Sequence, residues 1–224
     1  MIRLTIEDIR AALARPLPGV AAQVRLAPLH RIEQLYQAPP ADARPAGVLI
    51  ALYPHHGELH FPLTRRTEDV EKHKGQISLP GGAQEERESL LDTALRETHE
   101  EIGVRVDPAA VLGSLSPIFV PPSGFLITPF VAALPERPGF QILNNEVAEL
   151  IETPLSALFD PATVRRETWT VRGIEAEIPF FQIGPHKVWG ATAMVLSEFA
   201  MAIQSGTTKD TNEHKGSAVV NTKE

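Results

Sequence analysis

The chain has 224 residues, of which 43% are hydrophobic and 22% charged, and its formal net charge is −7. This composition is typical of a soluble globular protein, so it excludes a disordered or fibrous chain, and the acidic balance argues against a nucleic-acid partner. The longest apolar run, Ala46 to Tyr53, is far shorter than the roughly 18 residues of a membrane span, so no membrane partner is expected. The chain has no cysteine, which excludes disulfides and thiolate metal sites. Its start lacks the features of a secretory signal, so a cytoplasmic location is expected.

Residues 1–45 are predicted to form an N-terminal helix and an extended arm. Thr5 and Asp8 have the spacing of a capping box, which predicts a short helix that ends before Pro16. Beyond that point prolines recur too often for a long helix. We therefore expect extended segments with one short helix near residues 32–36.

Residues 46–204 are predicted to form one folded domain that contains both strands and helices. Two strands joined by a hairpin are expected in residues 47–66, because β-branched and apolar residues flank a glycine-containing connection. His55 and His56 lie in that turn, and without a third ligand at useful spacing they are expected to be exposed rather than metal-bound. Further strands are expected at "VLGSL", "IFV", "FLITPFVAAL", "TWTV" and "IEAEIPFF".

Three helices are predicted within this domain. One of them follows Pro154, and the segment before it, residues 144–153, is predicted to be either a helical turn or a strand. Ser89 and Asp92 have the N-cap and third-position spacing that starts a helix, and Gly103 is placed to end it in a left-handed C-cap. Residues 191–204 carry apolar side chains at helical spacing. The remaining segment, 205–224, has almost nothing to bury and is predicted to be a disordered tail.

Three glutamates on the helix that starts at Ser89 suggest the chemistry. At about 100° per residue, Glu97, Glu100 and Glu101 fall within one arc of roughly 100°, away from the apolar stripe. Carboxylates so close repel each other unless a cation lies between them. Ligation by oxygen alone suits hard ions such as Mg²⁺ or Mn²⁺, which also bind substrate phosphates. The sequence therefore predicts a divalent-metal site for phosphate chemistry, and the alternative is a solvated helix face.

The segment around these glutamates resembles the box of the Nudix hydrolases, which is a glycine, five residues, a glutamate, seven residues and then R-E-U-x-E-E-x-G-U with U apolar. The matching positions are Gly82, Glu88, Arg96, Glu97, Thr98, Glu100, Glu101, Gly103 and Val104. At average residue usage, the seven fixed identities would match by chance on the order of once in a million. The resemblance therefore outweighs the solvated-face alternative.

This resemblance implies an α+β fold, a Nudix-like α/β/α sandwich with a mixed β-sheet and the box as loop, helix and loop. It implies that the divalent ions are held by three side chains and one backbone carbonyl, those of Glu97, Glu100, Glu101 and Gly81. Arg96 would orient Glu97, and Glu88 would pair with Arg96 or bind a metal through water. The general base stays open between Glu100 and Glu101, with Glu146 as an outside candidate whose alternative is an ordinary surface carboxylate.

The stretch before the box, "LTRRTEDVEKHKGQISLPGG", resembles the signature of the coenzyme A pyrophosphatase branch. The residues that match it are Leu63, Thr64, Arg66, Gly75, Pro80, Gly81 and Gly82. Four positions depart from it, namely Pro62, Thr67, Leu79 and Glu71, and Glu71 matters most because it places an anion where the pattern has a cation. Positive charge for the 3′-phosphate of coenzyme A is still expected from four nearby side chains, Arg65, Arg66, Lys72 and Lys74.

Other substrate contacts are expected from the same resemblance. Gly75 belongs to the signature, and Ser123 and Phe125 lie in "PPSGFLITPFVA", which also resembles that branch. A proline- and glycine-containing turn needs no function to explain it, so these last two residues have an ordinary structural alternative.

The predicted reaction is metal-dependent hydrolysis of coenzyme A, or its derivatives, to 4′-phosphopantetheine and adenosine 3′,5′-bisphosphate. One alternative is the same chemistry on ADP-ribose or another nucleotide, for which Glu71 is the best support. A second is a catalytically silent module that binds a nucleotide for regulation, against which the complete carboxylate set argues. The expected partner is a small nucleotide substrate, with a homodimer as a further possibility.

Overall fold

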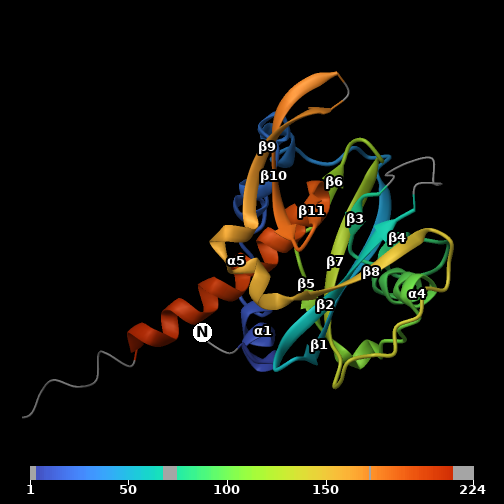
Figure 1. The fold of residues 1–224 in the computed structure, drawn as a ribbon, viewed down its shortest axis with the longest axis vertical. Helices are drawn as coiled ribbons and strands as arrows, with labels where there is room; N and C mark the ends of the chain where they lie inside the picture. The colour runs from blue at the N-terminus through green and yellow to red at the C-terminus, as the bar shows by residue number, and fades with distance from the viewer. Residues whose placement is uncertain (1–3, 68–74, 172, 214–224) are drawn as a thin grey trace, which may run out of the picture.

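The computed structural model describes residues 4–67, 75–171 and 173–213 of the chain. Its centre is a mixed sheet in the order β3-β2-β1-β7-β5, onto which β4, β6 and β8 pair through β1, β7 and β2 (Figure 1). The strands of this sheet are β1 (Arg44–His55), β2 (Glu58–Arg66), β3 (Ile77–Ser78), β4 (Gly81–Ala83), β5 (Val111–Ser114), β6 (Ile118–Val120), β7 (Phe125–Ala133) and β8 (Val147–Pro154). The hairpin expected in residues 47–66 is therefore confirmed as β1 and β2.

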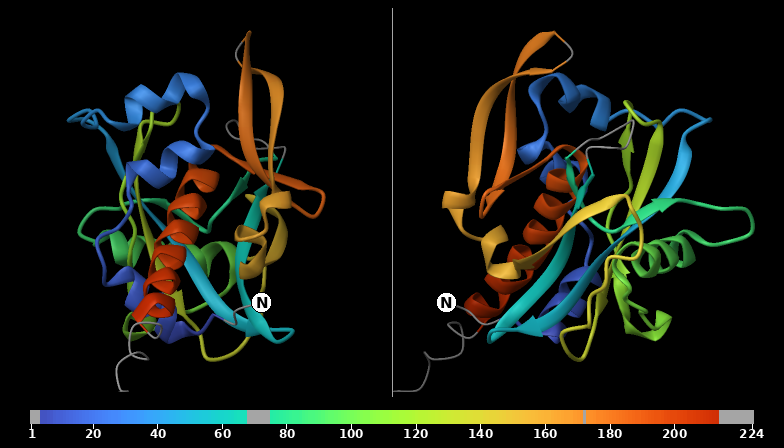
Figure 2. Two further views of the ribbon diagram at one scale, coloured as in Figure 1. Left: turned by 90° about the vertical axis from the view of Figure 1, so that its left-hand side faces the viewer. Right: turned by 45° about the vertical axis from the view of Figure 1, so that its right-hand side comes forward.

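Helices cover both faces of this sheet, with α4 on one side and α5 and α1 on the other (Figures 1 and 2). The α-helices are α1 (Ile6–Leu13), α2 (Val20–Gln23), α3 (Ile32–Leu35), α4 (Leu90–Ile102) and α5 (Gly190–Glu213). Short 3₁₀ helices connect them and the strands, at Val24–Leu26, Leu29–Arg31, Pro108–Ala110, Leu155–Leu158 and Pro161–Thr163. This arrangement confirms the predicted α/β/α sandwich.

Strand β1 makes the sheet mixed and separates two apolar cores. It runs parallel to β7 and antiparallel to β2 and β4. Because side chains alternate along a strand, Leu49 and Ala51 pack in the core beneath α4, whereas Ile50 and Leu52 pack in the larger core with α1 and α5. Each of these four side chains is at most 1% exposed.

A glycine in β1 brings helix α4 close to the sheet. A Cβ atom at Gly47 would lie 2.3 Å from the backbone oxygen of Leu90 and 3.3 Å from the Cβ of Ala94. No side chain fits in that space, which is a common reason for a glycine inside a strand. The first turn of α4 is thereby held directly against β1.

The N-terminal arm is built into the domain core rather than standing apart from it. Its first helix starts with the predicted capping box of Thr5 and Asp8, and the short helix expected near residues 32–36 is α3. Helix α2 and the turn after it, where we expected extended chain, pack on α5 through Leu26. Local proline content did not reveal this helix, because the surface of α5 that stabilises it lies far along the chain.

Helix α5 is longer than predicted. It continues past Gln204 to Glu213, so the prediction of a disordered tail is wrong for residues 205–213. Extending an existing helix adds a hydrogen bond for each residue fixed, without a new nucleation cost, which favours continuation beyond the packed part. The rest of the predicted tail, 214–224, lies outside the described residues.

A second, smaller sheet has the order β11-β10-β9, with strands β9 (Val164–Val171), β10 (Ile174–Ile183) and β11 (His186–Trp189). The β9–β10 hairpin projects from the body beside the N-terminal arm, and Arg166 in β9 donates to the backbone oxygen of Arg25 at 3.4 Å (Figure 2).

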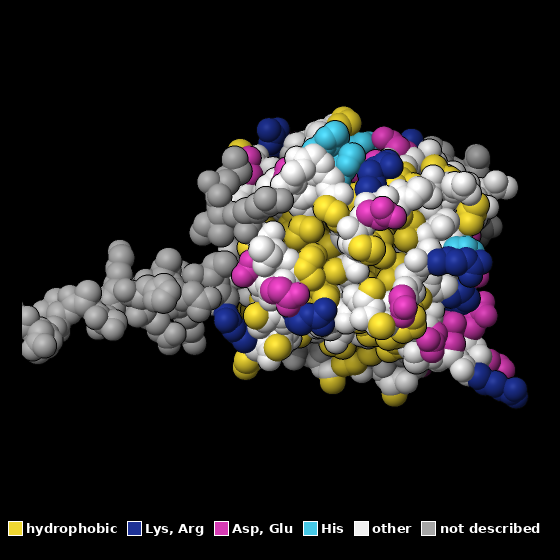
Figure 3. All heavy atoms as spheres, turned by 90° about the horizontal axis from the view of Figure 1, so that it is seen from below, with side chains coloured by type: hydrophobic (Ala, Val, Ile, Leu, Met, Phe, Trp, Pro, Cys, Tyr) yellow, Lys and Arg dark blue, Asp and Glu magenta, His cyan; other side chains and the backbone are white. Residues whose placement is uncertain are grey.

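Seen from below, acidic and basic side chains are interspersed among apolar ones, and histidines gather at one edge (Figure 3). In the described part of the chain, no helix has both the length and the apolar character to cross a bilayer.

Candidate active site

Helix α4 begins and ends where its local sequence predicts. The Ser89 hydroxyl accepts from the backbone N–H of Asp92 at 3.1 Å, and the Asp92 carboxylate accepts from the backbone N–H of Ser89 at 3.2 Å. At the other end, Gly103 has a φ of 74°, the left-handed conformation that glycine adopts without strain. These two caps set where along the sheet the box glutamates project.

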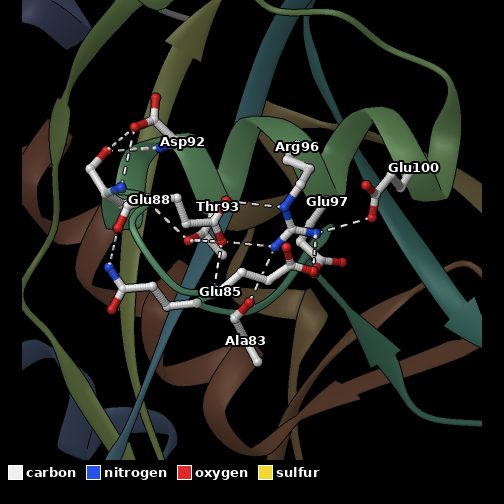
Figure 4. Close-up of polar contacts among 10 residues, drawn as sticks. Ala83, Glu85, Glu88, Asp92, Thr93, Arg96, Glu97 and Glu100 are labelled. Carbon is white, nitrogen blue, oxygen red and sulfur yellow. Dashed lines mark hydrogen bonds and ion pairs between the residues drawn. The ribbon is translucent and has the colours of Figure 1, made fainter.

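Arg96 lies at the centre of the box glutamates (Figure 4). Its Nε and Nη2 donate to the two carboxylate oxygens of Glu88 at 3.1 and 2.9 Å. Its Nη1 donates to Oε1 of Glu97 at 2.9 Å and to Oε2 of Glu100 at 3.0 Å. Nη2 also donates to the backbone oxygen of Ala83 at 3.3 Å. All three guanidinium nitrogens are therefore engaged, and the planar fork orients three carboxylates.

Glu88 fixes Arg96 from the loop before the helix. Its Oε1 also accepts from the backbone N–H of Glu85 and from the hydroxyl of Thr93, each at 2.8 Å. The hydrogen bonds from Arg96 are the main reason that the pKa of Glu88 is lowered to about 2. Thr93 is a residue that our reading of the sequence missed, and no motif signals it.

The glycines before the box make room for the carboxylates. A Cβ atom at Gly82 would lie 2.5 Å from the carboxyl carbon of Glu97, so this carboxylate rests directly against the backbone of β4. Gly81 has a φ of 150°, and a Cβ atom there would lie 2.3 Å from the backbone oxygen of Gly47. The backbone N–H of Gly81 donates a hydrogen bond to Glu101.

Glu101 is a buried carboxyl group with a free oxygen. It is 4% exposed, and its Oε2 has no hydrogen-bond partner. Burial raises the pKa of Glu101 to about 8, and the charge of Glu97 adds to this effect. Burial also raises the pKa of Glu97. A buried, incompletely bonded carboxylate is costly unless a cation compensates it.

These residues fit a divalent cation in chemical type. They offer only oxygen ligands, and the unpartnered Oε2 of Glu101 is the kind of donor that a hard ion would satisfy. Within the described ranges, however, no three His, Cys, Asp or Glu side chains are already placed to hold a metal ion. In this arrangement Arg96 binds oxygens of both Glu97 and Glu100.

Arg66 and Glu146 lie beside this cluster. Arg66 Nη2 donates to Oε2 of Glu146 at 2.6 Å, and the backbone N–H of Thr67 donates to the backbone oxygen of Glu146 at 2.9 Å. The charge of Arg66 lowers the pKa of Glu101 and that of Glu146 raises it, so both act on the buried carboxyl. The structure thus brings Glu146 to the box glutamates, although 45 residues separate it from Glu101 in the chain.

Other predicted substrate residues are placed differently. Arg65 is bound to Glu149 at 2.8 Å, and His186 lies 3.2 Å from the other oxygen of Glu149, so Arg65 does not join the cluster. Gly75 has a φ of 64°. Lys72, Lys74 and the aberrant Glu71 lie outside the described residues.

The predicted substrate-side loop lies at the start of β7. The Ser123 hydroxyl donates to the backbone oxygen of Val120 at 3.2 Å, so it closes the turn. The Phe125 ring lies under the guanidinium of Arg44, at 4.0 Å from the guanidinium carbon. Arg44 is a further residue that we missed, because only the parallel pairing of β1 with β7 brings it to this loop.

The histidines of the β1–β2 turn gain a neighbour in the structure. The rings of His55 and His56 are 3.8 Å apart, and the buried His60 lies 5.1 Å from His55. His56 is exposed, as expected for a turn, whereas His55 is half-buried. Among the side chains that the structure describes, these histidines do not form a metal-binding group.

A cavity of about 640 Å³ opens near the end of α4. The residues that line it are Thr67, Ile142, Leu143, Asn144, Asn145 and Val147. It adjoins the carboxylate cluster, since the backbone N–H of Leu143 donates to the backbone oxygen of Glu101 at 3.2 Å.

Comparison with known proteins finds one matching domain family and relatives that are 34% identical in sequence. The family profile described as "NUDIX domain" matches residues 43–172. The Nudix hydrolase NudL of Pectobacterium atrosepticum is 34% identical over 178 residues, which cover 75% of this chain and 89% of the relative. The protein of the same name from Photorhabdus laumondii is 34% identical over 145 residues, 63% of this chain and 76% of its own length. A crystal structure of a MutT/nudix family protein from Enterococcus faecalis has a TM-score of 0.48 and 19% identity, covering 86% of this chain and 73% of that one.

Proposed function

Because the chain belongs to the Nudix hydrolase family, which cleaves pyrophosphate bonds, we propose that it hydrolyses coenzyme A or its derivatives to 4′-phosphopantetheine and adenosine 3′,5′-bisphosphate. The observation that carries the hydrolytic part is the placement of Glu97 and Glu101 against the glycine backbone of β4. Glu97 is half-buried there, and Glu101 is buried with its Oε2 unbonded, which is a site prepared for a cation and a phosphate.

Members of this family generally use divalent metal ions, and we assign Mg²⁺ or Mn²⁺ to this chain from its all-oxygen donors. The residues that would hold the ion are Glu97, Glu100 and Glu101, with the backbone carbonyl of Gly81. When bound, the metal lowers the pKa of a bound water and neutralises phosphate charge.

The protein's own residues orient this site and move the proton. Arg96 holds Glu97 in place, and Glu88 in turn holds Arg96 through two hydrogen bonds. A proton from the attacking water needs an acceptor within reach. Three carboxylates are candidates: Glu100 and Glu101, which would also hold the metal, and Glu146, whose charge acts on Glu101. The pH dependence of turnover in each glutamine variant distinguishes them. Only loss of the general base removes the fall in activity at low pH that comes from protonating that base.

The choice of coenzyme A rests on the signature before the box rather than on the box itself. Its matching residues Thr64 and Arg66 lie on β2, and Arg66 reaches the cluster through Glu146. An incoming phosphate would compete with Glu146 for Arg66, which would bring positive charge to a surface that is otherwise acidic.

The test is mass-resolved product analysis of the purified protein with coenzyme A, with and without Mg²⁺ or Mn²⁺, beside ADP-ribose. Metal-dependent release of 4′-phosphopantetheine supports the proposal. If coenzyme A survives while ADP-ribose is cleaved, the enzyme acts on another nucleotide, as the pairing of both Arg65 and Arg66 with glutamates would favour. Nucleotide binding that persists in chelator, without turnover when metal is added, would instead indicate a regulatory binding module.

A further inference from the structure

We propose that the cavity lined by Thr67, residues 142–145 and Val147 binds the pantetheine half of coenzyme A, beyond its phosphate. This inference rests on the proposed function, and it adds the orientation in which coenzyme A lies in the site. The adenosine bisphosphate half then extends from the carboxylate cluster away from this cavity.

Backbone hydrogen bonds join both walls of the cavity to the segments that carry the site's carboxylates. On one wall, the backbone N–H groups of Gln141 and Leu143 donate to the backbone oxygens of Ile102 and Glu101, at 3.0 and 3.2 Å. On the other, the backbone N–H of Thr67 donates to the backbone oxygen of Glu146 at 2.9 Å. The cavity therefore lies directly beside the segments that carry Glu101 and Glu146.

The lining has no formal charge. Its side chains are three aliphatic groups, two amides and one hydroxyl. Phosphate groups are recognised by arginine, lysine or clustered N–H donors, so this lining does not suit the half of the substrate that carries a second phosphate. It suits the neutral half.

The individual groups of the lining also match a pantetheine chain. Ile142 and Leu143 are 46% and 52% exposed, unusually open for large apolar side chains that sit beside a charged cluster. The hydroxyl oxygen of Thr67 is buried and has no hydrogen-bond partner. Buried polar atoms are normally paired, so this hydroxyl points to a polar group of a ligand. Pantetheine offers two methyl groups on one carbon, a hydroxyl and two amides, and ligand cavities commonly combine apolar walls with a few polar groups in this way.

Product inhibition tests the assignment, because the two products are the two halves of the substrate. We expect Leu143→Ala to raise the inhibition constant of 4′-phosphopantetheine about tenfold, a loss of about 1.4 kcal/mol, and to leave that of adenosine 3′,5′-bisphosphate unchanged. Thr67→Val, which removes the hydroxyl at nearly constant volume, should shift the same constant in the same direction. The matched control is Leu29→Ala, an exposed leucine in the N-terminal arm, which should change neither constant.

Each contrary outcome has a distinct meaning. Equal changes in both inhibition constants, or a change for adenosine 3′,5′-bisphosphate alone, would overturn the inference while the proposed function stands. Failure of the wild-type enzyme to cleave coenzyme A would remove both together. Unaltered thermal unfolding of Leu143→Ala, expected for a half-exposed side chain, excludes misfolding as the cause of any change.

Discussion

Arg96 and its four oxygen-bearing neighbours show how single residues set the chemistry of this site. The Arg96 guanidinium binds the carboxylates of Glu88, Glu97 and Glu100, but it does not bind Glu101, the most buried carboxyl of the site. That residue therefore carries an electrostatic cost in the metal-free protein. Such a cost is common where a site is organised for function rather than for stability.

Glu101→Gln is expected to separate stability from activity. Its folded-state pKa of about 8 lies above the usual 4.5, so the carboxylate destabilises the metal-free fold increasingly as pH rises from 4.5 and fully above about 8. In chelator at pH 8 the variant should thus unfold at a higher temperature than wild type. Its metal-dependent turnover should fall by roughly 10³-fold, because a ligand is lost. Glu97→Gln should lose turnover similarly, whereas the exposed Glu86→Gln should behave as wild type in both assays.

Glu88 has the opposite pH dependence. Its folded-state pKa of about 2 lies below the usual 4.5, so its contribution to stability is complete above pH 4.5 and is lost as pH falls toward 2. We expect Glu88→Gln to lower the free energy of unfolding by about 1–2 kcal/mol at pH 7, allowing for solvent screening. Urea unfolding at pH 7, 5 and 3.5 should show this difference shrinking with acidity; a constant difference would contradict the role of the carboxylate charge.

At the scale of elements, the contact between α4 and β1 positions the whole box. Gly47→Ala would place a methyl group 2.3 Å from the backbone of α4, where only movement of the helix can relieve the clash. We expect a loss of about 1–3 kcal/mol in denaturant unfolding, as for other overpacked sites. Gly139→Ala is the matched control, because a Cβ atom there meets nothing within 4 Å.

Gly82→Ala should act on the site instead of the fold. The atom that its methyl group would meet belongs to the flexible carboxylate of Glu97, 2.5 Å away, which can rotate aside. Thermal unfolding should stay near that of wild type while turnover falls by roughly 10²-fold through a displaced ligand. Wild-type turnover in this variant would show that Glu97 does not work from its observed position.

Elements whose limits depend on local chemistry were predictable, and those that depend on partners were not. Helix α4 could be read from the Ser89 box and Gly103, because both caps are made within a few residues. Strands β3 and β4 have only two and three residues and exist through their pairing with β2 and β1. The segment of β8 was predicted to be either a strand or a helical turn. It is a strand because it pairs with β2, which its local sequence does not reveal.

At the scale of the whole molecule, the site was predictable only where its residues share one segment. The box could be read directly from the sequence, but the ion pairs made by Arg66 and Arg65 could not. Their carboxylate partners, Glu146 and Glu149, lie 80 and 84 residues further along the chain. Strand pairing brings these glutamates to the two arginines, which local sequence does not reveal, and the role of Arg65 and Arg66 in substrate binding stays a prediction.

The N-terminal arm is joined to the last helix by buried polar contacts. Gln23 donates to Oε2 of Glu198 at 2.9 Å, and both side chains are almost fully buried. Gln23→Ala should therefore lower the free energy of unfolding by about 1–3 kcal/mol, because it leaves a buried carboxylate oxygen without this donor. The exposed Gln34→Ala provides the comparison in the same unfolding experiment, and equal losses in the two variants would contradict the importance of the contact.

That contact also joins residues 175 positions apart, which constrains how a newly made chain can fold. Ile9 and Leu26 belong to the same core as Phe199, so these residues have no complete partner surface until the chain has been synthesised through α5. Non-local closure of this kind slows folding and leaves apolar surface uncovered while the ribosome is still at work. The core therefore cannot close before α5 has been made, and the interval before α5 arrives is when the chain is most exposed to aggregation.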